Sequence, residues 1–165
     1  HKKHKERSHR QKLVKWMILI SLASILVALY LLYLHYSITE SFCDFSEGLN
    51  CDIVNKSIYS EFPPNSGIPV SFMGIIIFLI VLISLKCIQH NKKFYFGKTT
   101  IDERALSSFI FYLMIASLIF ALYLVYAELF LILSICILCV VLDIFIFAML
   151  VLSYKLRGVI HGKTG

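Results

Sequence analysis

The longest nearly uncharged stretch of the sequence, from Ala105 to Leu152, limits what the chain can fold into. It contains only two charged residues, Glu128 and Asp143. As a single straight helix it would reach roughly 72 Å, more than twice the ~30 Å hydrocarbon core of a bilayer. We therefore expect it to fold back as two membrane-spanning helices. The turn is expected near Glu128, close to the midpoint, which would make Glu128 a turn charge.

Two other apolar stretches are long enough to cross a bilayer. Trp16 to Tyr36 runs without a formal charge, and a second stretch begins near Ile68, just after the helix breakers Pro63, Pro64 and Gly67. In the whole chain 59% of residues are apolar and 16% are charged, and the mean hydropathy is +0.81. Soluble domains carry about 25% charged residues. These values exclude a disordered chain, a disulfide-rich secreted miniprotein and a nucleic-acid-binding domain.

We predict an all-α integral membrane protein, built as a bundle of four transmembrane helices. A loop that contains two cysteines, together with a short helix, is expected to cap its outward side. The expected spans are residues 16–36, 68–88, 105–126 and 129–152, with the outer loop at 37–67. The catalytic bundle would cover 16–155, between a basic tail at 1–15 and a second tail at 156–165.

Lysine and arginine residues alternate between the two sides of this bundle. The segment 1–15 carries seven, the loop 37–67 one, the second loop and its edges five, the third turn none and the C-terminal segment three. Because such residues favour the cytoplasmic side, both termini are expected in the cytoplasm. The loop 37–67 would then face a periplasm, an exterior or an ER lumen, and these compartments permit disulfides.

The chain has five cysteines, four of which form two pairs on the predicted outer side. Cys43 and Cys51 lie in the outer loop, whereas Cys136 and Cys139 form a Cys-Ile-Leu-Cys motif some seven residues into the fourth span, or roughly 10 Å of helix. Two dithiol pairs on one side could relay electrons by thiol–disulfide exchange. The alternative is a structural loop disulfide with two packing cysteines in a helix. Cys87 stands alone and is expected to be a small apolar filler.

Asp143 is the other unusual residue, because a carboxylate within a span costs about 3 kcal/mol on insertion scales. With Cys136 and Cys139 it forms one helical stripe at i, i+3 and i+7. Reduction of a quinone takes two protons and two electrons, and a buried carboxyl near the acceptor could relay those protons. The alternative is a carboxyl that is hydrogen-bonded to another span. Two cysteines and His35 do not make a convincing zinc site, so no metal is expected.

Together these motifs resemble the vitamin K epoxide reductase family. The resemblance rests on Cys43-Asp44 followed by Cys51, on Ser57 six residues later, on Gly67-Ile-Pro-Val-Ser71 with Gly74, and on Cys136-Ile-Leu-Cys139. It covers about residues 16–155. It implies a four-helix bundle that reduces a quinone with electrons from a thioredoxin-like protein and so drives disulfide formation.

Carried over by position, Cys43 would take electrons from the partner, Cys51 would pass them to Cys136, and Cys139 would face the quinone. Ser57 matches a family serine near the active site and would be a hydrogen-bond donor. Many bacterial members have a fifth span and a fused thioredoxin-like domain. This chain shows neither, so the partner is expected to be a separate protein.

The substrate implied by the resemblance is a lipid quinone of the ubiquinone, menaquinone or vitamin K type. Vertebrate members bind vitamin K with an Asn and a Tyr, whose places are held here by Val70 and Asp143. This difference favours a plain quinone over an epoxide. The Gly67–Ser71 run looks like prokaryotic members, which implies a prokaryotic cytoplasmic membrane with the active site on its outer face. An ER membrane with a lumen-facing site is the alternative.

We expect the quinone pocket inside the bundle near Cys139, with Phe42, Phe45, Phe72 and Met73 as contacts. A short interfacial helix around Ser57 to Tyr59 would close it, with the apolar Ile53, Val54, Ile58 and Tyr59 toward the bilayer.

Two other functions are alternatives to a quinone reductase. In a DsbB-type oxidase the Cys-x-x-Cys motif comes early, after the first span, and the second cysteine pair comes late. This is the reverse of the order in the present sequence. A non-enzymatic tetraspan junction or adhesion protein would have a structural disulfide in its first outer loop and needs no motif of this kind in its fourth span.

Overall fold

A computed structural model describes residues 2–36, 48–62, 67–90, 94–96 and 99–162. Four long helices in these ranges are apolar enough and long enough to cross a membrane. They are α1 (Lys2–Tyr36), α3 (Val70–Gln89), α4 (Glu103–Tyr126), which a π-helical turn η2 (Ala127–Ile132) extends, and α5 (Ile137–Gly162). The predicted four-helix membrane bundle is therefore confirmed.

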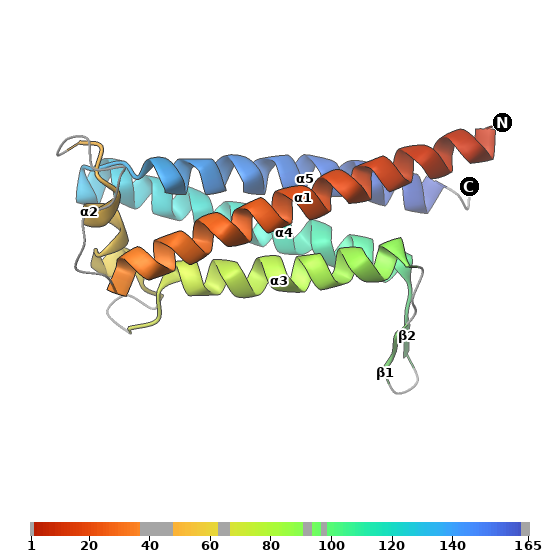
Figure 1. Ribbon diagram of the computed structural model, residues 1–165, viewed down its shortest axis with the longest axis horizontal. Helices are drawn as coiled ribbons and strands as arrows, with labels where there is room; N and C mark the ends of the chain where they lie inside the picture. Colours follow the sequence, from red (N-terminus) through yellow and green to blue (C-terminus); the bar gives the residue numbers. More distant parts are fainter. Residues whose placement is uncertain (1, 37–47, 63–66, 91–93, 97–98, 163–165) are drawn as a thin grey trace.

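The four helices form a closed ring in which each helix has two neighbours. Helices α1 and α4 both pack against α3 and α5, so α3 and α5 lie on a diagonal of the bundle. Figure 1 shows both termini at one end of the bundle and the short helix α2 (Cys51–Asn55) at the other. We call these the basic end and the cap end. The even number of spans explains why the two termini share one end.

Helix α1 begins much earlier than the expected span, because the basic segment before Trp16 is itself helical. Lysine, arginine, glutamine and glutamate are good helix formers. Arg10 holds this part of the helix against the bundle. Its guanidinium forms an ion pair with Glu103 and donates a hydrogen bond to the carbonyl oxygen of Ile88. Helix α5 likewise continues beyond Leu152, to Gly162.

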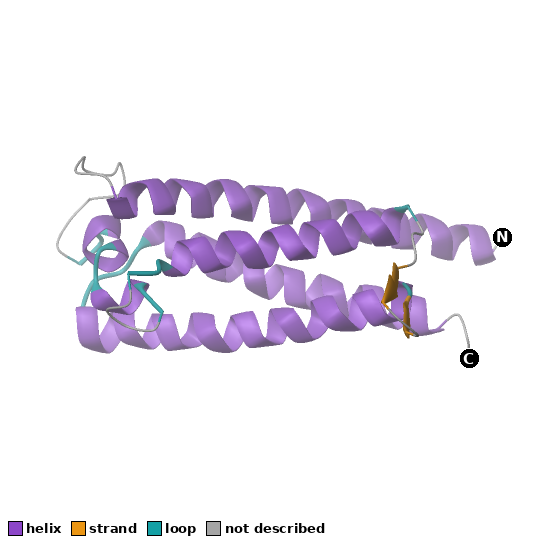
Figure 2. Ribbon diagram, turned by 90° about the horizontal axis from the view of Figure 1, so that it is seen from below, coloured by secondary structure: helices purple, strands orange, loops and turns teal. Residues whose placement is uncertain are grey.

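A two-stranded antiparallel hairpin projects from the basic end, and it was not expected from the sequence. Strands β1 (Phe94–Phe96) and β2 (Thr99–Ile101) pair in the connection from α3 to α4. They are drawn in orange at the basic end in Figure 2. Helix α4 then begins at an N-cap formed by Asp102, whose side chain accepts a hydrogen bond from the amide of Ala105 at 3.1 Å.

The buried core has two parts. The larger one joins all four helices toward the basic end and includes Met17, Leu85, Ile110, Met149 and Leu156. Cys87 belongs to this cluster as a free thiol, which agrees with a packing role. The smaller one lies at the cap end and consists of Leu31, Cys51, Val54 and Cys136. The described cysteines of the predicted relay are therefore packed apart from the main core.

Candidate redox site at the cap end

Cys51 opens the short helix α2, whose start is fixed by Asn50. The side-chain oxygen of Asn50 accepts hydrogen bonds from the backbone amides of Asp52 at 2.9 Å and Ile53 at 3.1 Å. This is the usual geometry of an asparagine N-cap. Cys51 is fully buried and disulfide-bonded. Its expected partner, Cys43, lies outside the described residues.

A short backbone bridge joins the loop before Cys51 to the segment before Cys136. Leu49 and Ile135 form a parallel β-bridge. The amide of Asn50 donates to the carbonyl oxygen of Ile135 at 3.1 Å, and the amide of Ile135 donates to the carbonyl oxygen of Gly48 at 2.9 Å. Since Asn50 and Ile135 each directly precede a cysteine, the bridge sets the register of Cys51 against Cys136. Both cysteines are buried in the same cluster.

The Cys136–Cys139 motif lies at the start of α5. The expected depth of seven residues within the fourth span is therefore wrong, because the turn between α4 and α5 comes later than Glu128. Cys136 immediately precedes the first helical residue, Ile137. The backbone amide of Cys139 donates to the Sγ atom of Cys136 at 3.3 Å. The sulfur thus takes the role that a serine or aspartate oxygen has at most helix N-termini. Both cysteines are free thiols.

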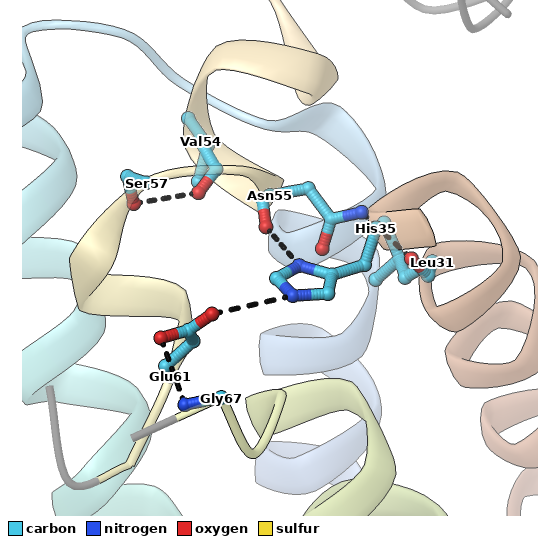
Figure 3. Close-up of polar contacts among 7 residues, drawn as sticks. All are labelled: Leu31, His35, Val54, Asn55, Ser57, Glu61 and Gly67. Carbon is cyan, nitrogen blue, oxygen red and sulfur yellow. Dashed lines mark hydrogen bonds and ion pairs between the residues drawn. The ribbon is translucent and has the colours of Figure 1, made fainter. Parts of the chain in front are cut away.

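A polar network ties the cap to α1 near the same site, as Figure 3 shows. The side-chain amide of Asn55 donates to the carbonyl oxygen of Leu31 at 2.6 Å, and Nδ1 of His35 donates to the carbonyl oxygen of Asn55 at 2.7 Å. Nε2 of His35 lies 3.6 Å from a carboxylate oxygen of Glu61, whose other oxygen accepts from the amide of Gly67 at 3.1 Å. His35 is thus part of the network that anchors the cap to α1.

A cavity of about 290 Å³ opens beneath the cap, between the four long helices. This is close to the lower end of the ~300–1,000 Å³ that ligand pockets occupy. Its walls are mostly apolar, which is typical of a site for a hydrophobic ligand. Of the four apolar residues expected to close the pocket, Val54 and Tyr59 line the cavity, whereas Ile53 and Ile58 are exposed and are not part of its lining. The apolar walls include Ala28, Leu31, Val70, Ile77, Phe78, Leu113, Phe120, Leu124, Ile132, Leu142 and Ile146.

Cys139 and Asp143 both line this cavity, whereas Cys136 is buried behind it. Cys139 therefore faces the cavity, whereas Cys136 packs in the same cluster as Cys51. Asp143 lies one helical turn after Cys139 on α5, as the stripe in the sequence predicted.

Two serine hydroxyls at the cavity differ in what they can offer a ligand. Ser57 lines the cavity, but its Oγ donates to the carbonyl oxygen of Val54 at 2.8 Å, so its hydrogen is already used. The Oγ atom of Ser71 is also buried at the cavity and has no hydrogen-bond partner among the described residues. A buried unsatisfied hydroxyl is costly. Ser71 is therefore the stronger candidate for donating a hydrogen bond to a bound carbonyl group.

Glu128 is the main residue that sequence reasoning placed wrongly. It was expected at the turn between two spans, but it lies within η2, is 5% exposed and lines the cavity together with Cys139 and Asp143. The reason is the π-helical turn, which continues α4 to Ile132 and moves the chain reversal to Leu133 and Ser134. The signal that could have found it is the rarity of an ionisable residue inside an apolar stretch.

The four predicted quinone contacts lie in different places relative to the cavity and to the described residues. Met73 lines the cavity. Phe72 does not; its side chain is 45% exposed and lies outside the lining. Phe42 and Phe45 lie outside the described residues. Among the residues that are described, no group of three His, Cys, Asp or Glu side chains could hold a metal ion.

A dithiol beside an apolar cavity, next to the disulfide-bonded Cys51, is an arrangement that suits redox chemistry. The sequence matches the vitamin K epoxide reductase family over residues 15–154. The chain belongs to the vitamin K epoxide reductase family. A comparison with curated protein sequences gave no match. Family membership identifies a membrane oxidoreductase of the class that acts on quinones in disulfide formation, and it replaces the tetraspan adhesion alternative.

Proposed function

We propose that the protein is a thiol:quinone oxidoreductase that takes electrons from a thioredoxin-like protein through Cys43 and Cys51. Cys51 passes them to Cys136, and Cys139 delivers them to a lipid quinone in the cavity. The observation that carries this proposal is the backbone bridge between Asn50 and Ile135, which brings two buried cysteines of different segments into register.

The relay proceeds by disulfide exchange, so its steps balance without another reductant. Cys51 attacks the Cys136–Cys139 disulfide at Cys136, and Cys139 leaves as the thiolate. Cys43 then displaces Cys136 from Cys51 and closes the loop disulfide. The combination in this structure, with Cys51 disulfide-bonded and Cys136 and Cys139 free, corresponds to the state just before quinone reduction. Negative charge on Cys136 as it leaves faces the positive end of the α5 dipole.

The residues around the cavity suit a plain quinone of the ubiquinone, menaquinone or vitamin K type. The apolar walls fit a ring with an isoprenoid tail, and Ser71 supplies a donor for one ring carbonyl. Val70 lines the cavity at the place where vertebrate relatives carry an amide, and it offers no hydrogen bond. Asp143 is the proposed proton donor. An epoxide substrate is disfavoured by the absence of an amide at position 70.

The cap end is proposed to face outward, on the periplasmic side of a prokaryotic cytoplasmic membrane. The basic residues support this orientation, since seven lie in the segment 1–15 and one in 37–67. Labelling of single cysteines introduced at Lys3 and Lys56 with a membrane-impermeant reagent in intact cells tests it. We expect labelling at position 56 alone. Labelling at position 3 alone would reverse the topology.

The activity is tested by reconstituting the protein in liposomes that contain one quinone at a time. A reduced thioredoxin-like protein is added and quinol formation is followed by absorbance. Quinol should form with at least one of the three quinones and should stop after Cys139→Ala. Failure of all three quinones to accept electrons, with the protein folded, would contradict the proposal.

A further inference from the structure

We propose that Glu128 is a second proton-transfer group of the quinone site, held at the cavity by the π-helical turn η2 and working with Asp143. This inference rests on the proposed function and deepens it. It concerns how the two protons reach the quinone, whereas the cysteines account for the two electrons.

The position of Glu128 carries the first part of the argument. Its side chain is 5% exposed, and it lines the same cavity as Cys139 and Asp143. The two carboxyl groups come from different elements, η2 and α5, which meet at this cavity. A buried carboxyl group is expensive in an apolar bundle. Its presence at the reactive thiol therefore indicates a role in the chemistry of that site.

The backbone that holds Glu128 carries the second part. Residues Ala127–Ile132 form a π-helical turn, and it ends at Leu133, which has φ 60° and ψ 32°. A leucine in the left-handed region is strained, and π-turns occur often at functional sites. The carbonyl oxygen of Glu128 accepts hydrogen bonds from the backbone amides of both Leu133 and Ser134, the latter at 3.2 Å. The strained segment thus fixes Glu128 in the turn that leads to the Cys136–Cys139 motif.

The chemistry balances within the cavity. The Cys136–Cys139 dithiol is oxidised to a disulfide and the quinone is reduced to a quinol. Two S–H bonds break, one S–S bond forms and two O–H bonds form. Glu128 and Asp143 each take a thiol proton and give one to a ring oxygen. With two carboxyl groups at one cavity, neither proton has to come from the aqueous phase. The cap lies between that phase and the cavity.

The test compares Glu128→Gln, Asp143→Asn and the double variant in liposomes, with Glu6→Gln as the matched control. Glu6 is exposed on α1 at the basic end. Two single-turnover rates are measured in each variant, namely exchange from Cys51 to Cys136 and quinol formation. The solvent deuterium isotope effect on quinol formation is measured as well, since a purely structural role of Glu128 would not move it.

For Glu128→Gln we expect quinol formation to fall about 100-fold, because general acid–base groups contribute ~10²–10⁴-fold. The isotope effect should rise and the exchange rate should stay near the wild-type value. Glu128→Asp, which keeps the carboxyl group, should recover part of the rate. If Gln at position 128 prevents folding, Glu128→Asp alone decides, with slowed quinol formation and unchanged exchange expected.

Quinol formation within twofold of wild type in Glu128→Gln, or in Glu128→Asp where only that variant folds, would overturn the inference. Equal loss of exchange and quinol formation in a folded variant, with an unchanged isotope effect, would also overturn it. A wild-type protein that reduces no quinone would instead overturn the proposed function, so the two failures are distinguishable.

Discussion

The backbone amide of Asn50 donates a hydrogen bond to the carbonyl oxygen of Ile135 at 3.1 Å, and each of these two residues directly precedes a cysteine of the proposed relay. The side chain of Asn50 also caps the helix that Cys51 begins. One residue therefore sets both the position of Cys51 along the cap and its register against Cys136. The proposed relay depends on this geometry, since exchange requires the attacking and attacked sulfur atoms to meet.

Asn50→Ala should slow exchange between Cys51 and Cys136. Loss of an asparagine N-cap costs about 1 kcal/mol of helix stability, and fraying of α2 moves Cys51 away from Cys136. We expect exchange to be roughly fivefold slower in single-turnover measurements, which is the effect of raising the free energy of the reactive arrangement of Cys51 and Cys136 by about 1 kcal/mol. Asn50→Asp keeps an acceptor oxygen at the cap and should behave nearly as wild type. Equal rates in all three proteins would show that the cap does not position Cys51.

Asn55→Ala should loosen the cap from α1. It removes the hydrogen bond from the Asn55 side chain to the carbonyl oxygen of Leu31, and removal of one partner of a buried hydrogen bond costs about 1–3 kcal/mol. Backbone amides of α2 should then exchange with deuterium about tenfold faster or more, while those in the middle of α3 stay unchanged. Lys56→Ala is the control, since Lys56 is exposed on the same cap. Faster exchange in the control alone would refute the anchoring role.

Ser71→Ala should weaken quinone binding without stopping the chemistry. Its hydroxyl is buried at the cavity with no partner in the described part of the chain, so it is free to donate to a ring carbonyl. A hydrogen bond contributes about 0.5–1.5 kcal/mol net, and we expect the KM for quinone to rise about three- to tenfold with kcat little changed. Ser117→Ala is the matched control, because Ser117 also lines the cavity but donates to the carbonyl oxygen of Leu113. An identical KM shift in both variants would argue against a direct contact of Ser71.

The sequence predicted the fold well because the bilayer leaves few alternatives. An uncharged stretch longer than the hydrocarbon core has to turn back, and backbone groups in lipid have to be satisfied within helices. The same reasoning placed Cys139 and Asp143 on one face of one helix. It could not place the turn, because a π-helical turn and a left-handed Leu133 have no signature in the apolar run AELFLIL.

The parts of the site that were missed depend on tertiary contacts. Asn50 could have been read as an N-cap from its place before Cys51, since asparagine favours that position. Its bond to Ile135 joins residues far apart in the sequence, and no local pattern shows it. The same holds for Ser57 and Ser71. Only the structure shows that the first hydroxyl donates to Val54 and that the second faces the cavity with no partner among the described residues.

The central claim, that electrons pass from Cys51 through Cys136 and Cys139 to a quinone, is tested most directly by trapping disulfides in a single turnover. Wild type, Cys43→Ser and Cys139→Ser proteins are mixed in quinone liposomes with a reduced thioredoxin-like protein, quenched in acid, and their disulfides mapped by mass spectrometry. Cys139→Ser should form no quinol, because it cannot close the Cys136–Cys139 disulfide that quinone reduction produces. Cys43→Ser should accumulate a Cys51–Cys136 disulfide, because the cysteine that displaces Cys136 from Cys51 is missing, and it should not accept electrons from the partner. Full quinone-dependent activity in Cys139→Ser, or in Cys136→Ala, would contradict the relay.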